Sequence, residues 1–204
     1  HKLYNFAAIL KVDPACIYRE LISEWNNPAA LVIGAENPQG ILWAAAKSQH
    51  LVDVVEEFQY LDTLNYLPDN ILTKVDRASM AVSLEARTPI LDHRIVEFAW
   101  RLPMTFKIRA KQRKWLLRQV AYKYIPRDLL ERRKAGFKIP IDDWLKGSLR
   151  DWSESLLDKK RLSEEGFLNP VMVHERWNEH LSGQRNWKGS LWNVLMFQSW
   201  LEAQ

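Results

Sequence analysis

The sequence has a single cysteine among its 204 residues. Cys16 has no partner for an internal disulfide, and a cysteine-rich zinc site is excluded. This scarcity suits a reducing compartment, and we expect a cytoplasmic protein. No apolar run approaches the roughly 20 residues that span a bilayer, so we expect no membrane partner. The chain opens at His1 without a signal-peptide pattern, and we expect it to be a piece of a longer protein.

Motifs that hold metals or phosphates are scarce as well. The five histidines form no tight pair, and His174 and His180 are six residues apart, a poor spacing for a shared helical metal site. No Ser-Gly-Gly occurs, and Gly34 and Gly40 do not form a phosphate-binding loop. We therefore expect no metal site within this chain.

Tryptophan, in contrast, is abundant, with ten residues. Each tryptophan brings a large area to bury and an N–H that needs a partner. We expect an aromatic-rich core, with Trp177, Trp187, Trp192 and Trp200 in that core rather than on a platform for stacking bases. Apolar residues make up 47% and charged residues 26% of the chain, which is typical of a globular protein. Residues 1–204 are predicted to form a single helical domain.

Basic residues are concentrated between Arg101 and Lys138. This segment has 13 of them and only two acidic residues, Asp128 and Glu131. The net charge of this segment is +11. Such a segment can attract a polyanion, whether ATP and pyrophosphate, nucleic acid or an acidic partner surface. It is equally compatible with a solvated helix face that acids elsewhere in the fold balance.

Apolar spacing predicts a mainly α-helical chain without a convincing run of alternating strands. Prolines predict interruptions of the helical pattern at Asn27-Pro28, Leu67-Pro68-Asp69 and Thr88-Pro89. Asp69 and Asp92 are predicted N-caps. Helices are expected after Asp13-Pro14, from about Gln49 to Tyr66, from Asp69 to Val82, after Asp92, from Lys111 to Tyr124, and near 142–157, 171–181 and 190–201.

Charged residues are dense between Leu67 and Arg94, among small and apolar residues. Some of these charges are predicted to be partly buried and therefore paired. From spacing alone, an ion-pair network that holds a helix to a loop is favoured over a binding site. The charges are Asp69, Lys74, Asp76, Arg77, Glu85, Arg87, Asp92 and Arg94.

The stretches KVDRASMA (74–81) and SLEARTPILDHR (83–94) resemble the most characteristic region of the glutamine-hydrolysing asparagine synthetases. Ile90 stands where this family usually has Phe. The stretch LERRKAGF (130–137) resembles the family's loop with a functional lysine, and the end of the chain, from His180 to Leu201, is similar to that of many bacterial members. The strongest resemblance covers residues 67–204.

The resemblance implies a fold and a reaction. The chain would be the helical C-terminal portion of an α/β synthetase domain like the adenine-nucleotide alpha-hydrolases, with the parallel sheet and the phosphate loop largely outside it. The parent protein would use ATP and Mg²⁺ to adenylate the side chain of aspartate. Ammonia, released from glutamine by an N-terminal glutaminase domain, would then give asparagine, AMP and pyrophosphate. The fragment alone is expected to be inactive and to bind neither cofactor tightly.

The resemblance also assigns roles to residues. A fixed cation is needed where charge builds on the departing pyrophosphate, and Lys134 matches the family lysine at that step. A cation can hold the carboxylate of an amino-acid substrate, and an acidic side chain can hold its ammonium. The residues that match the family's positions for binding this substrate are Lys74, Glu85 and Arg87. Residues assigned to support of the site are Asp76, Arg77, Asp92 and Gly136.

Expected partners are aspartate, ATP, ammonia, the rest of the synthetase domain and the glutaminase domain, but not nucleic acid. A homodimer is left open. Two alternatives remain. One is a related amidotransferase that acts on another carboxylate, as β-lactam synthetases and peptide- or polysaccharide-modifying enzymes do. The other is a non-catalytic helical scaffold or anion-binding module.

Overall fold

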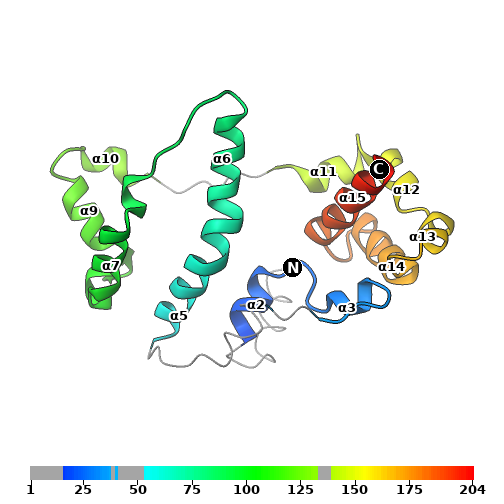
Figure 1. Cartoon of the computed structure of the whole chain (residues 1–204), viewed down its shortest axis with the longest axis horizontal. Coiled ribbons are helices and arrows are strands. Elements are labelled where there is room, and N and C mark those ends of the chain that lie inside the picture. Colours follow the sequence, from blue (N-terminus) through cyan, green and yellow to red (C-terminus); the bar gives the residue numbers. More distant parts are fainter. Residues whose placement is uncertain (1–15, 38–39, 41–52, 133–138) are drawn as a thin grey trace. The chain divides into compact units, whose positions relative to one another are not determined.

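The computed structural model describes residues 16–37, 40, 53–132 and 139–204 (Figure 1). The described chain is mainly helical and contains one small antiparallel hairpin. Its contacts divide the chain into two compact units. Unit 1 comprises His1–Leu72 and Ile139–Gln204, and unit 2 comprises Thr73–Lys138. The mainly helical class is thus confirmed, whereas the single domain over residues 1–204 stays a prediction.

Unit 1 is made of helices from both ends of the chain. Its elements are α2 (Ile17–Ile22), α3 (Pro28–Leu31), α5 (Val54–Leu61), η3 (Asp62–Leu72), α11 (Ile141–Lys146), α12 (Arg150–Leu156), α13 (Lys159–Glu165), α14 (Pro170–Leu181) and α15 (Lys188–Glu202). The elements of unit 2 are α6 (Thr73–Met80), η4 (Pro89–Leu91), α7 (His93–Arg101), α8 (Met104–Lys107), β1 (Ile108–Arg109), β2 (Gln112–Arg113), α9 (Trp115–Ala121) and α10 (Arg127–Leu130).

The long C-terminal helices follow the sequence signals closely. Helix α14 begins with Pro170 in its first turn, and the side chain of Asn169 accepts hydrogen bonds from the backbone N–H groups of Val171 and Met172. This combination of an Asn cap and an early proline is a favourable helix start. Helices α14 and α15 confirm the predictions near 171–181 and 190–201.

The predicted break at Leu67-Pro68-Asp69 is wrong. Element η3 is a π-helix that contains Pro68, so Asp69 is not an N-cap there. In an α-helix, a proline ring meets the carbonyl oxygen four residues earlier. A π-turn shifts each hydrogen bond to the residue five positions away, which spares that carbonyl. The wider turn therefore carries the helix through a proline that would otherwise end it.

Two further helix predictions need correction. The helix expected from Lys111 begins only at Trp115, because Ile108–Arg109 and Gln112–Arg113 pair as a tight hairpin. Ala110 and Lys111 at its turn have φ values of 48° and 65°, in the left-handed region that an α-helix excludes. The helix expected over 142–157 is divided into α11 and α12 at Gly147, whose φ and ψ are −127° and −106°.

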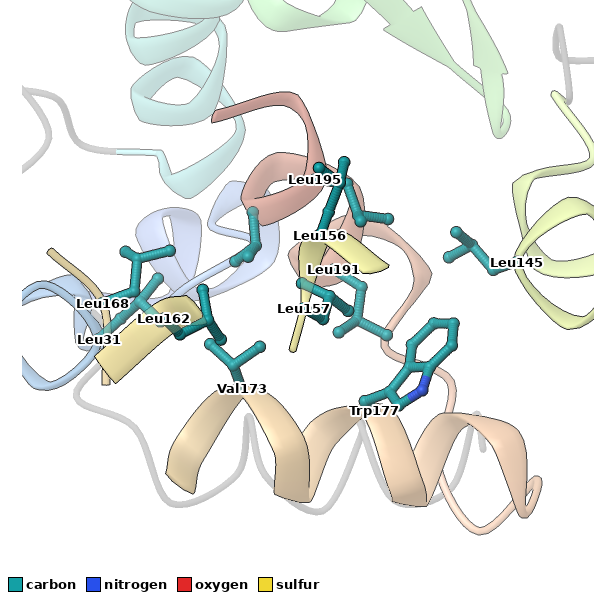
Figure 2. Packing of buried hydrophobic residues seen from close by; sticks show 11 residues of the cluster. Leu31, Leu145, Leu156, Leu157, Leu162, Leu168, Val173, Trp177, Leu191 and Leu195 are labelled. Atoms are coloured by element: carbon teal, nitrogen blue, oxygen red, sulfur yellow. The ribbon is translucent and has the colours of Figure 1, made fainter. Parts of the chain in front are cut away.

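Unit 1 has a core of leucines from five helices and their connections (Figure 2). Trp177 on α14 belongs to this core, and four more tryptophans pack against it while partly buried, which confirms the expected aromatic contribution. Trp200 is the exception, since 57% of it is exposed. The core residues are Leu31, Leu145, Leu156, Leu157, Leu162, Leu168, Val173, Trp177, Leu191, Val194 and Leu195.

The segment around α3 is fastened to the C-terminal helices of unit 1. The indole N–H of Trp25 donates to the carbonyl of Ser190 at 3.1 Å. The backbone N–H of Asn169 donates to the carbonyl of Leu31 at 2.7 Å. The guanidinium of Arg176 lies 3.7 Å from the ring centre of Trp25 and 4.1 Å from that of Trp187. A cation between two indole faces gains from both ring quadrupoles.

Candidate active-site region

Helix α6 carries three of the predicted site residues, Lys74, Asp76 and Arg77, and all three are exposed. Arg77 Nε lies 4.0 Å from Asp76 Oδ2, a loose contact between sequence neighbours. Within the described residues, the structure gives no ion pair between Lys74 and Glu85. The helix therefore presents its cations to solvent, and the predicted partial burial of these charges is wrong for this part of the chain.

The carboxyl end of α6 turns the chain toward Glu85 by a specific hydrogen-bond pattern. The N–H of Ser83 donates to Met80 O at 2.9 Å, and the N–H of Leu84 donates to Ser79 O at 3.0 Å. These are the two bonds of a Schellman motif, in which one residue adopts left-handed geometry. Ser83 is that residue, with a φ of 58°. The motif ends the helix sharply and starts the extended stretch that holds Glu85 and Arg87.

Glu85 and Arg87 form a two-point ion pair. Arg87 Nε donates to Glu85 Oε1 at 2.9 Å, and Arg87 Nη2 donates to Oε2 at 3.1 Å. Their side chains are 67% and 82% exposed. An exposed pair of this kind contributes only about 0–1 kcal/mol. The two predicted substrate-side residues are thus brought together, in an arrangement that costs little to open.

Asp92 caps helix α7, as the sequence predicted. Its Oδ1 accepts the backbone N–H of Arg94 at 2.9 Å, and both carboxylate oxygens accept hydrogen bonds from the Arg94 guanidinium, each at 2.9 Å. These bonds, chiefly those from the guanidinium, hold the pKa of Asp92 below its usual range. The carboxylate therefore stays ionised and fixes the turn that follows Pro89.

The basic segment of unit 2 is organised around aromatic rings and one carboxylate. Arg109 on β1 lies 4.8 Å from the ring centre of Trp115, and Lys107 lies 5.0 Å from that of Trp100. Glu131, at the end of α10, accepts hydrogen bonds from three side chains. Sequence reasoning treated Glu131 only as a counter-charge, because nothing in its spacing indicates that distant donors meet there.

Lys134 and Gly136 lie outside the described residues. Their predicted roles, at the pyrophosphate and in support of the loop, stay predictions. In the described part of the chain, no group of three or more His, Cys, Asp or Glu side chains could hold a metal ion. No helix among the described residues is both long and apolar enough to cross a membrane.

The described residues of unit 2 enclose almost no interior. Among its described residues, 73–132, none is buried. Its apolar side chains lie on the surface instead, including those at the end of α6 and along α7. A domain of this size normally encloses a core, and large exposed apolar surfaces indicate contacts with other protein. The exposed large apolar residues of unit 2 are Val75, Met80, Val82, Leu84, Ile90, Ile95, Phe98, Phe106, Leu117, Val120, Tyr124, Ile125 and Leu129.

Comparison with known proteins gives a consistent result. The family model described as asparagine synthase matches residues 3–202. Asparagine synthetase [glutamine-hydrolyzing] 1 of Bacillus subtilis is 30% identical over 146 residues, which are 72% of this chain and 23% of that protein. Asparagine synthetase [glutamine-hydrolyzing] 3 of the same organism is 34% identical over 117 residues, 52% of this chain and 19% of that protein.

A more distant relative has a different name. Amidase chyE of Penicillium rubens is 26% identical over 118 residues, 54% of this chain and 18% of that protein. No solved structure matches the chain. The chain therefore spans less than a quarter of the length of each of these relatives.

Proposed function

The chain belongs to the asparagine synthase family, and we propose that it is the C-terminal part of a glutamine-hydrolysing asparagine synthetase. The parent protein would adenylate the side-chain carboxylate of aspartate with ATP, and ammonia from glutamine would then displace AMP to give asparagine. The observation that carries this proposal is the family match over residues 3–202, which includes every residue assigned to the site.

The substrate-side roles fit the geometry of Glu85 and Arg87. Aspartate carries one ammonium and two carboxylates, and Glu85 and Arg87 offer a negative group for the ammonium and a positive group for a carboxylate. Because their exposed ion pair is weak, a substrate can exchange for it at little cost. Lys74 supplies a further exposed cation for a carboxylate. Asp76, Arg77 and Asp92 would hold α6 and α7 in place around these groups.

On the pyrophosphate side, we assign the cation to Lys134. A lysine is a compact point charge that suits phosphate oxygens, and Gly136 would give its loop the freedom to approach them. Mg²⁺ and ATP, which would supply the adenylyl group, would be held mainly by the rest of the synthetase domain of the parent protein. The protein would act in the cytoplasm.

The surface of unit 2 supports the view that the fragment is incomplete. Its exposed apolar side chains would be covered by the rest of the synthetase domain. That part and the glutaminase domain would account for the remaining three quarters of the relatives' length. Burial of apolar area contributes about 25 cal/mol per Å², so even part of this surface would bind the missing portion firmly. We infer that the isolated 204-residue chain does not form amides.

The proposal is tested with the full-length parent protein. Wild type should convert aspartate, glutamine and Mg-ATP to asparagine with release of pyrophosphate. Lys134→Ala should abolish pyrophosphate release while circular dichroism and thermal unfolding stay unchanged. Lys160→Ala, which removes an exposed lysine of α13 in unit 1, is the matched control and should keep full activity. Normal pyrophosphate release by Lys134→Ala would contradict the assignment.

A second candidate function is amide formation on a carboxylate other than aspartate. The similarity to amidase chyE favours it. That protein matches 54% of this chain, yet its name does not make it an asparagine synthetase. Substrate-dependent pyrophosphate release distinguishes the two. Release that needs aspartate supports the synthetase, whereas release with other carboxylic acids and none with aspartate supports the second candidate.

A further inference from the structure

The short segment that carries Glu85 and Arg87 depends on its two ends for its shape. Among the described residues, the charged groups of Glu85 and Arg87 pair only with each other, and residues 85–87 make no backbone hydrogen bond. Both side chains are mostly exposed, so water competes for their ion pair. A weak pair of near neighbours does not fix the direction of a chain. The geometry of the segment therefore comes from the residues on either side of it.

The carboxyl-side end of the segment is fixed at Pro89. The ring of Pro89 locks its own φ and restricts Thr88, whose φ and ψ are −115° and 90°. The N–H of Leu91 donates to Thr88 O at 3.0 Å, and the N–H of Asp92 donates to Pro89 O at 3.1 Å. The chain thus has little freedom where the segment ends.

The amino-side end of the segment turns on the backbone of Ser83. The φ of Ser83 is 58°, whereas a residue that continued helix α6 would have a φ near −63°. The difference is a rotation of about 120° about a single bond, and it redirects all of the chain that follows. Glu85 is only two residues further on. The left-handed conformation of Ser83 therefore decides where Glu85 and Arg87 point.

Serine is an uncommon residue for this conformation. The left-handed region brings Cβ close to the next carbonyl oxygen, and glycine usually takes this place at the end of a helix. Strained backbone of this kind is concentrated at binding and active sites. Ser83 is exposed, and its hydroxyl makes no hydrogen bond within the described part of the chain. The segment thus uses the backbone of Ser83 rather than its side chain.

We propose that Ser83 is a positioning residue for Glu85 and Arg87, because its left-handed backbone aims the segment that carries both groups. This inference rests on the proposed function, in which Glu85 holds the ammonium and Arg87 a carboxylate of the amino-acid substrate. Misplacement of a group in an active site by 1 Å can cost about 100-fold in rate. A different φ at Ser83 therefore weakens the use of the amino acid and leaves the use of ATP unchanged.

The test is Ser83→Val in the full-length parent protein. A side chain branched at Cβ is an outlier in left-handed geometry, so valine drives the backbone out of it. The KM for aspartate should rise about tenfold or more, while the KM for ATP stays within about twofold. Ser155→Val is the matched control, because Ser155 is an exposed serine inside helix α12. It should leave both KM values unchanged.

Ser83→Gly separates the backbone from the side chain. Glycine adopts the same φ without strain, so this variant should keep both KM values within about twofold. A rise in Ser83→Gly as large as in Ser83→Val would assign the effect to the hydroxyl and overturn the inference. An unchanged KM for aspartate in Ser83→Val would also overturn it, as would an equal rise in the KM for ATP.

Failure of this inference is distinguishable from failure of the proposed function. An unchanged KM for aspartate in both Glu85→Gln and Arg87→Ala sinks their substrate-binding role. Raised values in those two variants beside an unchanged value in Ser83→Val sink only the positioning role. Should Ser83→Val fail to fold, as judged by its melting temperature, Ser83→Leu lacks the branch at Cβ and should raise the KM for aspartate less. An unchanged value in that variant counts against the positioning role.

Discussion

His180 makes the stability of unit 1 sensitive to acid. It lies at the end of α14 and is completely buried. Its Nδ1 accepts the backbone N–H of Trp187 at 3.3 Å, so the neutral ring carries its proton on Nε2. Nε2 faces Asp142 Oδ1 at 3.5 Å. Protonation would place a second proton on Nδ1, where it would meet the N–H of Trp187 and remove that hydrogen bond.

The direction of the pH effect follows from the burial of His180 and the charges around it. Burial lowers the pKa of His180, Lys146 and Lys188 lower it further, and Asp142 partly opposes them. The unfolded chain therefore binds more protons than the folded chain between the lowered value and the usual 6.5. The contribution of His180 to the free energy of unfolding is fully present above about pH 6.5 and is lost as the pH falls below that value. The loss is at most about 1.4 kcal/mol per pH unit for one proton, and it ends below the folded-state pKa.

Urea unfolding followed by tryptophan fluorescence between about pH 5 and pH 8 measures this slope. The ring centre of Trp177, one of the ten tryptophans that contribute to the signal, lies 6.3 Å from that of His180. His180→Gln should reduce the dependence of unfolding free energy on pH below about 6.5. His93→Gln, which changes a histidine whose side chain is 78% exposed, should keep it. A wild-type slope in His180→Gln would refute the reasoning.

Three other substitutions test the remaining structural conclusions, each by chemical or thermal unfolding. Leu195→Ala should destabilise unit 1 by about 2–5 kcal/mol because its side chain is fully buried, while Leu117→Ala, 46% exposed, should cost far less. Arg176→Lys should cost about 1 kcal/mol by removing the planar cation between Trp25 and Trp187, and Arg150→Lys on the surface should be neutral. Ser83→Gly should stabilise by up to about 1 kcal/mol because it relieves left-handed geometry, whereas Ser79→Gly inside α6 should destabilise by a similar amount.

Signals that act within a few residues were read correctly from the sequence. The Asp92 cap and the extended Thr88 before Pro89 depend on neighbouring backbone groups alone. The same holds for the apolar spacing of α15, which contributes Leu191, Val194 and Leu195 to the core of unit 1. Such features need no knowledge of distant contacts, because their energetics are local.

Other features depend on backbone choices that side-chain patterns do not encode. Pro68 normally signals a break, and here a π-helix carries the chain past it. Ala110 and Lys111 form a tight turn with positive φ although neither is Gly, Asn or Asp, the residues that mark such turns. Glu131 accepts hydrogen bonds from side chains up to 19 positions away, and no spacing rule predicts that these donors converge.

The exposure of Glu85 and Arg87 bears on the substrate-binding role that we propose for them. A buried network would resist opening, because separating a buried ion pair leaves an unpaired charge at a cost of about 3–5 kcal/mol. The Glu85–Arg87 pair is exposed on both sides and costs about 1 kcal/mol or less to part. Groups that must release each other to take up an ammonium and a carboxylate need such a low cost. The feature that argues against a buried structural network is therefore the same one that would allow the exchange with an amino-acid substrate that we propose.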